Sequence, residues 1–145
     1  MNQNKITCAN ISLNGGSNIE KSIAEVLDGF SISELKKDRI GGPQTIAKYE
    51  KYKKGFEEIK TKFPQYDWDF IYKMFLDANK LCWKYEAAIR QGVVDHDPLF
   101  VHKHSELVRE FNSMRIALGN LVSLFLGETE ELNIKSQHVS EGTKQ

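Results

Sequence analysis

Apolar residues recur at intervals of three and four along most of the chain, which is the spacing of one face of an α-helix. One long run has steps of 3-4-3-4-3, through Ile71, Met74, Ala78, Leu81, Tyr85 and Ala88. A second run has steps of 4-3-4-3-4-3-4, through Phe100, His104, Leu107, Phe111, Met114, Leu118, Leu121 and Phe125. Because this alternation is typical of helices that pack along a coiled-coil seam, the pattern predicts two long helices in contact.

Capping signals bound these two helices. Asp67 precedes the first as an N-cap, and Gln91-Gly92 closes it. Asp97-Pro98 opens the second, with proline at the first helical position, where its fixed φ and missing N–H do no harm. The short connection predicts that residues 68–91 and 98–126 form an antiparallel αα-hairpin. The side chains expected in its core seam, or in an oligomer interface, are Leu81, Tyr85, Leu107, Phe111, Met114 and Leu118.

The segment before the hairpin predicts shorter helices. Ser17 to Glu20 and Ser31 to Glu34 both have the spacing of a capping box, and Gly29 between them offers a helix stop. Residues 17–40 therefore predict two short helices, which form either a helix-turn-helix that reads DNA or a simple packing pair.

Gly41-Gly42-Pro43 is a predicted break and a candidate hinge. The segment after it has the period of an amphipathic helix, which we expect to end before Pro64 because the residue preceding a proline avoids the helical region. The apolar face of this helix holds Ile46, Tyr49, Tyr52, Phe56 and Ile59.

Together these elements predict an all-α fold in which short N-terminal helices precede a long hairpin. At 145 residues the chain can close one hydrophobic core. We expect a flexible leader over residues 1–16, the helical pair over 17–40, the hairpin core over 44–127 and an acidic, polar tail over 128–145. The two cysteines lie far apart, and the start has neither a signal-peptide pattern nor a membrane-spanning run, so a reducing cytoplasmic compartment is expected.

The formal net charge is zero, but the charges are unevenly distributed. Residues 31–62 contain nine Lys and Arg against five Asp and Glu, a local net charge of +4. Such a segment is either a solvated helix face or a surface that attracts phosphates. The residues predicted to contact DNA are Lys36, Lys37, Arg39, Lys48, Lys51, Lys53 and Lys54.

No catalytic pattern occurs in the sequence, and we predict no enzyme activity and no cofactor. The densest polar cluster combines residues 95–97 with His102 and His104, and these two histidines lie about 200° apart on a helix, so no metal site is assigned. His104 lies in the predicted seam. It either fixes the register of the helices or lies at the solvent-accessible end of the hairpin.

From about Tyr49 to Gly119 the order of features resembles the small subunit of a tailed-phage DNA-packaging terminase, in the family whose members carry a helical hairpin. The shared features are the helix containing residues 49–52, an acidic helix start at Asp67, a long helix containing Tyr85, a linker ending in residues 97–99, and a second long helix. That family often follows its final glycine with a Leu-Thr-Pro turn and a nearby arginine. This chain instead continues as a predicted helix through residues 120–125.

The resemblance implies a non-catalytic, ring-forming subunit that recognises double-stranded viral DNA and presents it to the large terminase subunit in the host cytoplasm. It implies that the lysines of residues 36–62 contact phosphates and that the hairpin is the homo-oligomer interface. The alternative is a helical adaptor or inhibitor, of phage or bacterial origin, that binds a protein partner and no DNA.

Overall fold

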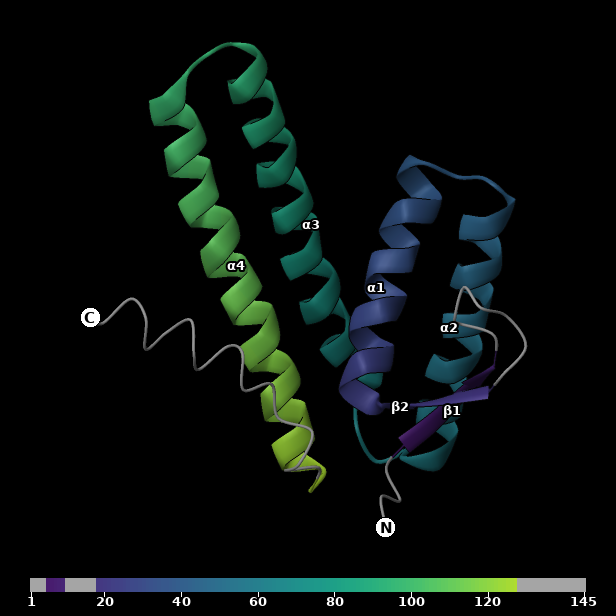
Figure 1. Ribbon diagram of the computed structural model, residues 1–145. Helices are drawn as coiled ribbons and strands as arrows, with labels where there is room; N and C mark the ends of the chain where they lie inside the picture. The colour runs from purple at the N-terminus through teal and green to yellow at the C-terminus, as the bar shows by residue number, and fades with distance from the viewer. Residues whose placement is uncertain (1–4, 10–17, 128–145) are drawn as a thin grey trace.

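The computed structural model describes residues 5–9 and 18–127, and this part of the chain has the predicted all-α fold with a long antiparallel helical hairpin (Figure 1). A short antiparallel ribbon precedes the helices. The elements are β1 (Lys5–Ala9), β2 (Asn18–Ser22), α1 (Ile23–Arg39), α2 (Pro43–Lys62), α3 (Trp68–Val94) and α4 (Pro98–Phe125). Figure 1 shows α1 between α2 and the hairpin of α3 and α4, so that α1 is the central helix.

The N-terminal ribbon corrects two predictions. Residues 5–9 are not part of a structureless leader, because β1 pairs with β2 with Thr7 opposite Glu20. The first helix does not start at Ser17 either, since residues 18–22 form a strand and the helix begins at Ile23. A third capping-box pattern, Ser22 to Glu25, which was not predicted, caps this helix: the Glu25 N–H donates to Ser22 Oγ (3.2 Å) and the Ser22 N–H to Glu25 Oε1 (2.9 Å). The rest of the predicted leader and the predicted tail over 128–145 lie outside the described residues.

The prediction of two short helices over residues 17–40 is wrong, because α1 runs without a break from Ile23 to Arg39. Helix-turn-helix geometry is therefore absent from this segment. Gly29 does not stop the helix. A Cβ built there would clash with the Tyr52 ring, so glycine lets α2 approach closely. Ser31 does not cap a new helix, since its hydroxyl donates to the Asp28 carbonyl (2.7 Å) within α1.

The turn after α1 and the helix that follows it agree with the prediction. Gly41 and Gly42 have φ values of 73° and 98°, a region that favours glycine, and Pro43 occupies the first turn of α2. α2 ends at Lys62, before Pro64. Its buried side chains pack on α1 in one core with the start of α3 and the end of α4. That core contains Ile23, Ala24, Val26, Leu27, Phe30, Tyr52, Phe56, Ile59, Trp68, Phe75 and Val122.

The hairpin has the predicted N-caps and a shorter turn than predicted. Asp67 and Asp97 each accept a hydrogen bond of 3.1 Å from the backbone N–H three residues later. The first helix of the hairpin, α3, does not end at Gly92 as predicted but continues to Val94. Gly92 is buried instead, because a Cβ there would lie 2.8 Å from Val101 Cγ2 on α4. Across residues 5–9 and 18–127, the helices are too short or too polar to span a membrane.

The predicted seam is correct near the middle of the hairpin and wrong at Met114. The rings of Tyr85 and Phe111 stack with centroids 5.7 Å apart and planes at 8°. Of the other four predicted side chains, three are partly buried and one is exposed. Leu81, Leu107 and Leu118 are half-buried, whereas Met114 is 59% exposed. The reason is that α4 packs on α1 as well as on α3, which centres its buried face on Val122 and Ser123 and turns Met114 outward.

Candidate functional site

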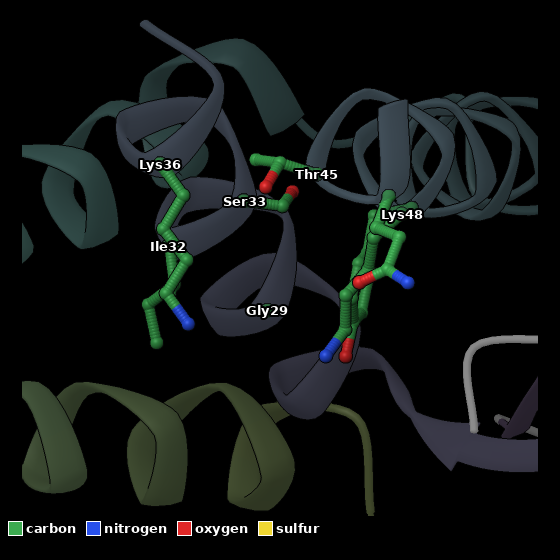
Figure 2. Close-up of a pocket in the computed structure, with 8 residues that line it drawn as sticks. Gly29, Ile32, Ser33, Lys36, Thr45 and Lys48 are labelled. Carbon is green, nitrogen blue, oxygen red and sulfur yellow. The ribbon is translucent and has the colours of Figure 1, made fainter. Parts of the chain in front are cut away.

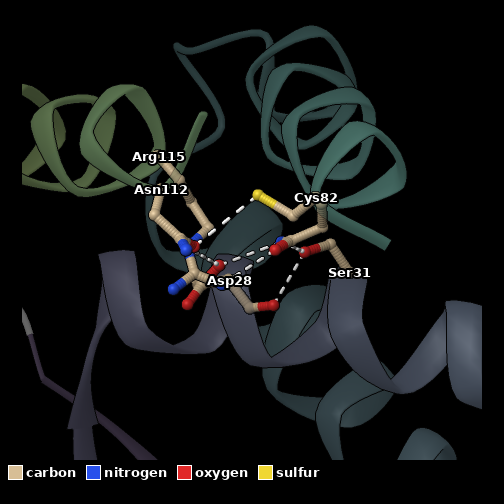
Figure 3. Close-up of polar contacts among 6 residues, drawn as sticks. Asp28, Ser31, Cys82, Asn112 and Arg115 are labelled. Carbon is tan, nitrogen blue, oxygen red and sulfur yellow. Dashed lines mark hydrogen bonds and ion pairs between the residues drawn. The ribbon is translucent and has the colours of Figure 1, made fainter. Parts of the chain in front are cut away.

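A buried polar junction joins α1, α3 and α4 (Figure 3). Asn79 is 5% exposed, and its Nδ2 donates to Ser31 Oγ (2.7 Å) and to Asp28 Oδ1 (3.0 Å). The Arg115 guanidinium donates to Asn79 Oδ1 (2.9 Å) and pairs with Asp28 (3.7 Å). Because each polar group in the cluster has a partner, the junction fixes the position of the hairpin on α1.

Cys82 lies at the edge of this junction and donates from Sγ to Asn112 Oδ1 (3.6 Å), as Figure 3 shows. Burial raises the pKa of the Cys82 thiol, and the opposing effect of the Arg115 charge is smaller. A thiol that is protonated at neutral pH is a poor nucleophile. The junction is therefore a structural cluster, and chemistry at Cys82 is not favoured.

A cleft of about 290 Å³ lies between α1 and α2. Figure 2 shows Lys36 of α1 and Lys48 of α2 on either side of Ser33 and Thr45. The cleft therefore brings together two of the predicted basic residues, one from each side of the glycine turn. Its lining residues are Gly29, Ile32, Ser33, Lys36, Gln44, Thr45, Lys48 and Tyr52.

The seven predicted basic residues do not form one patch. Lys37 lies 4.1 Å from the centre of the Tyr49 ring and pairs with Asp38 (3.6 Å). Arg39 lies over the Trp83 ring of α3, at 5.2 Å. The remaining three are on α2 outside the cleft, with Lys51 half-buried and Lys53 and Lys54 exposed. Helix geometry separates them, since the predicted set includes neighbours in sequence that point in different directions.

The face of the hairpin across the seam from α1 carries large exposed apolar side chains. On α3 they lie one turn apart, and on α4 they follow one stripe at spacings of seven and four residues. We call this set the far-face stripe. It consists of Phe70 (62% exposed), Met74 (37%), Met114 (59%), Leu121 (63%) and Phe125 (64%).

The far-face stripe is where the sequence pattern and the single-chain fold disagree. Met74, Met114, Leu121 and Phe125 all belong to the apolar repeat that predicts a buried seam. Within one chain they stay exposed, because α1 covers the opposite face of the hairpin through Asn79 and Val122. Large apolar side chains left exposed along one hairpin in this way are typical of a surface that binds another protein surface.

No family model, curated protein or solved structure matches this chain. The candidate function therefore depends on these surfaces and on the resemblance in the order of helices.

The histidines near the hairpin tip have local partners. His104 Nδ1 lies 2.9 Å from the Phe100 carbonyl oxygen, and its ring lies between those of Phe100 (4.0 Å) and Tyr85 (5.7 Å). His102 lies 3.1 Å from Glu106 one turn later on the exposed face. Among the residues whose placement is described, no group of three His, Cys, Asp or Glu side chains could hold a metal ion.

Sequence reasoning missed the polar junction and the cleft. Asn79 offers a signal in the sequence, because it is a polar residue beside Ala78 inside an otherwise apolar helical period. Its partners on α1 and α4 are 48 and 36 residues away, so only the packing identifies them. The cleft has no sequence signal beyond the lysines themselves, since Lys36 and Lys48 belong to different helices.

Proposed function

We propose that this protein is the non-catalytic, oligomeric DNA-recognition subunit of a phage DNA-packaging terminase, acting in the host cytoplasm. The observation that carries the proposal is the far-face stripe, which leaves one side of the hairpin ready to pack on a second copy. The order of helices, from the α2 segment through the Asp67 and Asp97 caps to α4, supports the same family.

A second copy is a suitable occupant for the far-face stripe. The stripe is contributed by both antiparallel helices of one face, so two copies related by a two-fold axis can bury the same residues against each other. The sequence has zero formal net charge, which limits electrostatic repulsion between copies. Larger assemblies follow if a second surface also engages.

The DNA part of the proposal is supported by the basic side chains of α1 and α2 and not by a helix-turn-helix. Lys53 and Lys54 are exposed on α2, and Lys36 and Lys48 line the cleft. Contacts of this kind reach phosphates and carry little sequence information. Several copies on one oligomer act together, because linked sites make later contacts intramolecular and raise avidity by roughly 10²–10⁴ when the geometry permits.

Sedimentation velocity at tens of micromolar tests the assembly. The wild-type chain should sediment as an oligomer, and the double variant Met114→Lys, Leu121→Lys should shift to monomer because two charges would enter the apolar contact. Val94→Lys is the matched control: this residue is 69% exposed and lies at the hairpin tip, outside the far-face stripe. A wild-type protein that stays strictly monomeric contradicts the proposed assembly.

Duplex DNA binding at two salt concentrations tests recognition. Affinity should fall steeply as salt rises, because each phosphate contact releases counterions. Lys53→Glu, Lys54→Glu should weaken binding, while the far-face variant measured at equal chain concentration should lose only the part due to avidity. If the wild-type protein does not bind the duplex, or binds it with an affinity that does not change with salt, the proposed DNA recognition is wrong.

A protein adaptor without DNA binding is the second candidate. It is favoured by the hairpin tip, where Val93 (60% exposed), Val94 (69%) and Leu99 (82%) present apolar side chains to solvent. A helical hairpin with an apolar tip can insert into a groove of a partner protein. Three results together would select this candidate. The chain is monomeric, it shows no salt-sensitive DNA binding, and its capture of a phage or host protein is lost on Leu99→Asp.

A further inference from the structure

The cleft between α1 and α2 has the composition of a small anion site. Its walls supply two lysines, the Thr45 hydroxyl and the Gln44 amide, and no carboxylate lines it. The Ser33 hydroxyl also lines the cleft but already donates to the Phe30 carbonyl (2.8 Å). Its volume of about 290 Å³ is close to the lower end of known ligand pockets, roughly 300 Å³, and suits a small group. Gly29 keeps one wall open to α2, because any larger residue there would meet the Tyr52 ring.

The two lysines of the cleft differ from several others in this protein. Lys60 and Lys73 each pair with an aspartate, Asp69 at 2.9 Å and Asp77 at 2.6 Å. Lys36 and Lys48 have no ion-pair or hydrogen-bond partner for their ammonium groups among the residues that the structure describes. Two positive charges without a neighbouring carboxylate favour an anion between them.

The start of α2 adds a second attraction at the same place. Gly42, the N-cap, makes no side-chain capping hydrogen bond, and the first i to i−4 backbone bond of the helix runs from the Ile46 N–H to the Gly42 carbonyl (3.0 Å). The amides of Gln44 and Thr45 precede that bond, and both residues line the cleft. The partial positive charge of a helix N-terminus therefore adds to that of the two lysines.

We propose that this cleft binds a phosphoryl group, with Lys36 and Lys48 as the cations and the Thr45 hydroxyl and the first turn of α2 as hydrogen-bond donors. The group belongs either to the backbone of DNA or to a free phosphate compound, which present the same chemistry to the cleft. The inference does not depend on self-association, since every lining residue comes from one chain.

Isothermal titration of the full-length chain at low salt tests the site with two probes, inorganic pyrophosphate and a short DNA duplex. Lys36→Gln, Lys48→Gln should weaken binding of at least one probe by about tenfold or more, which corresponds to about 1.4 kcal/mol, because both charge-assisted hydrogen bonds to the anion are lost. The matched control is Lys80→Gln, Lys103→Gln, which removes the same charge from exposed positions on α3 and α4, outside the cleft and outside the basic residues proposed to contact DNA. The control should keep pyrophosphate binding unchanged.

The two probes distinguish the sources of the phosphoryl group. Cleft-dependent binding of the duplex alone identifies the DNA backbone, and cleft-dependent binding of pyrophosphate identifies a free phosphate compound; either result supports the site. Wild-type protein that binds neither probe, or a cleft variant and a control that weaken binding equally, overturns it. Sedimentation of the same samples separates this failure from failure of the proposed assembly, because Lys36 and Lys48 lie outside the far-face stripe.

Discussion

The Asn79 carboxamide donates a 2.7 Å hydrogen bond to the Ser31 hydroxyl, which fixes the angle at which the hairpin meets α1. Asp28 and Arg115 complete the junction from α1 and α4. The same contact determines which face of the hairpin stays exposed. A hairpin rotated about its axis would bury the far-face stripe and expose Asn79, so the junction and the proposed interface are linked.

Replacing Asn79 tests this junction. Asn79→Ala removes the partner of Arg115, Asp28 and Ser31 at once, and a buried polar group left unpaired costs about 1–3 kcal/mol. We expect a loss of about that size in the free energy of unfolding, measured by urea denaturation. Gln65→Ala, an amide removed from an exposed loop, is the control and should change stability by less than about 0.5 kcal/mol.

Phe75 and Met114 should respond in opposite ways to truncation. Phe75 is 1% exposed and belongs to the core, so Phe75→Ala should cost about 3–5 kcal/mol of unfolding free energy. Met114→Ala should cost less than about 0.5 kcal/mol in dilute monomer, and should instead reduce self-association. A large loss of monomer stability from Met114→Ala means that this side chain is buried within one chain after all.

Two helical glycines form a matched pair. Alanine is the better helix former by about 0.5–1 kcal/mol, so Gly119→Ala should stabilise the protein, since its Cβ would meet only Ala24 at an ordinary 3.7 Å. Gly29→Ala should destabilise it by about 1–3 kcal/mol despite the same gain, because the buried Tyr52 ring must move. Thermal unfolding of both variants decides the matter: equal shifts of Tm contradict close packing at Gly29.

Tyr72 should make stability depend on alkaline pH. Burial, together with its hydrogen bond to Glu34 (2.8 Å), raises the pKa of the Tyr72 hydroxyl well above its ordinary value of 10.0. Below pH 10 the hydroxyl is protonated in both states. As pH rises through 10 it ionises only in the unfolded chain, so stability falls.

Comparison with Tyr72→Phe isolates this effect from other groups that titrate in the same range. The stability advantage of the wild type over this variant should shrink by about 1.4 kcal/mol between pH 9 and pH 11, which corresponds to one proton over one pH unit above 10. Urea denaturation at the two pH values measures it. An advantage that does not change with pH shows that Tyr72 ionises in the folded protein as it does in the unfolded chain.

The sequence alone determined the features that depend on neighbouring residues. Asp67 and Asp97 cap their helices because a carboxylate accepts from an amide three residues away, and this geometry needs no distant partner. Gly41 and Gly42 make the turn because of their own backbone freedom. The apolar period then predicted the lengths of the hairpin helices and their antiparallel pairing.

Only the tertiary structure decided which of two competing local signals prevails. Two capping-box patterns, Ser17 to Glu20 and Ser22 to Glu25, lie next to each other near the start of α1. Pairing with β1 takes residues 18–22 into a strand, so Ser22 becomes the cap. A glycine at position 29 is compatible with the end of a helix or with the close approach of another helix. In the structure α2 approaches closely here, with the Tyr52 ring packed against Gly29. Both outcomes depend on contacts between segments that are distant along the chain.

The tertiary structure likewise determines the direction in which each apolar helix face points. A period of three and four residues says that a helix has an apolar face, but it does not say which partner covers that face. α4 has two neighbours, and the Asn79 junction with α1 turns Met114 and Leu121 to the outside. A different contact, the packing of α2 back along α1, brings Lys36 and Lys48 to one cleft.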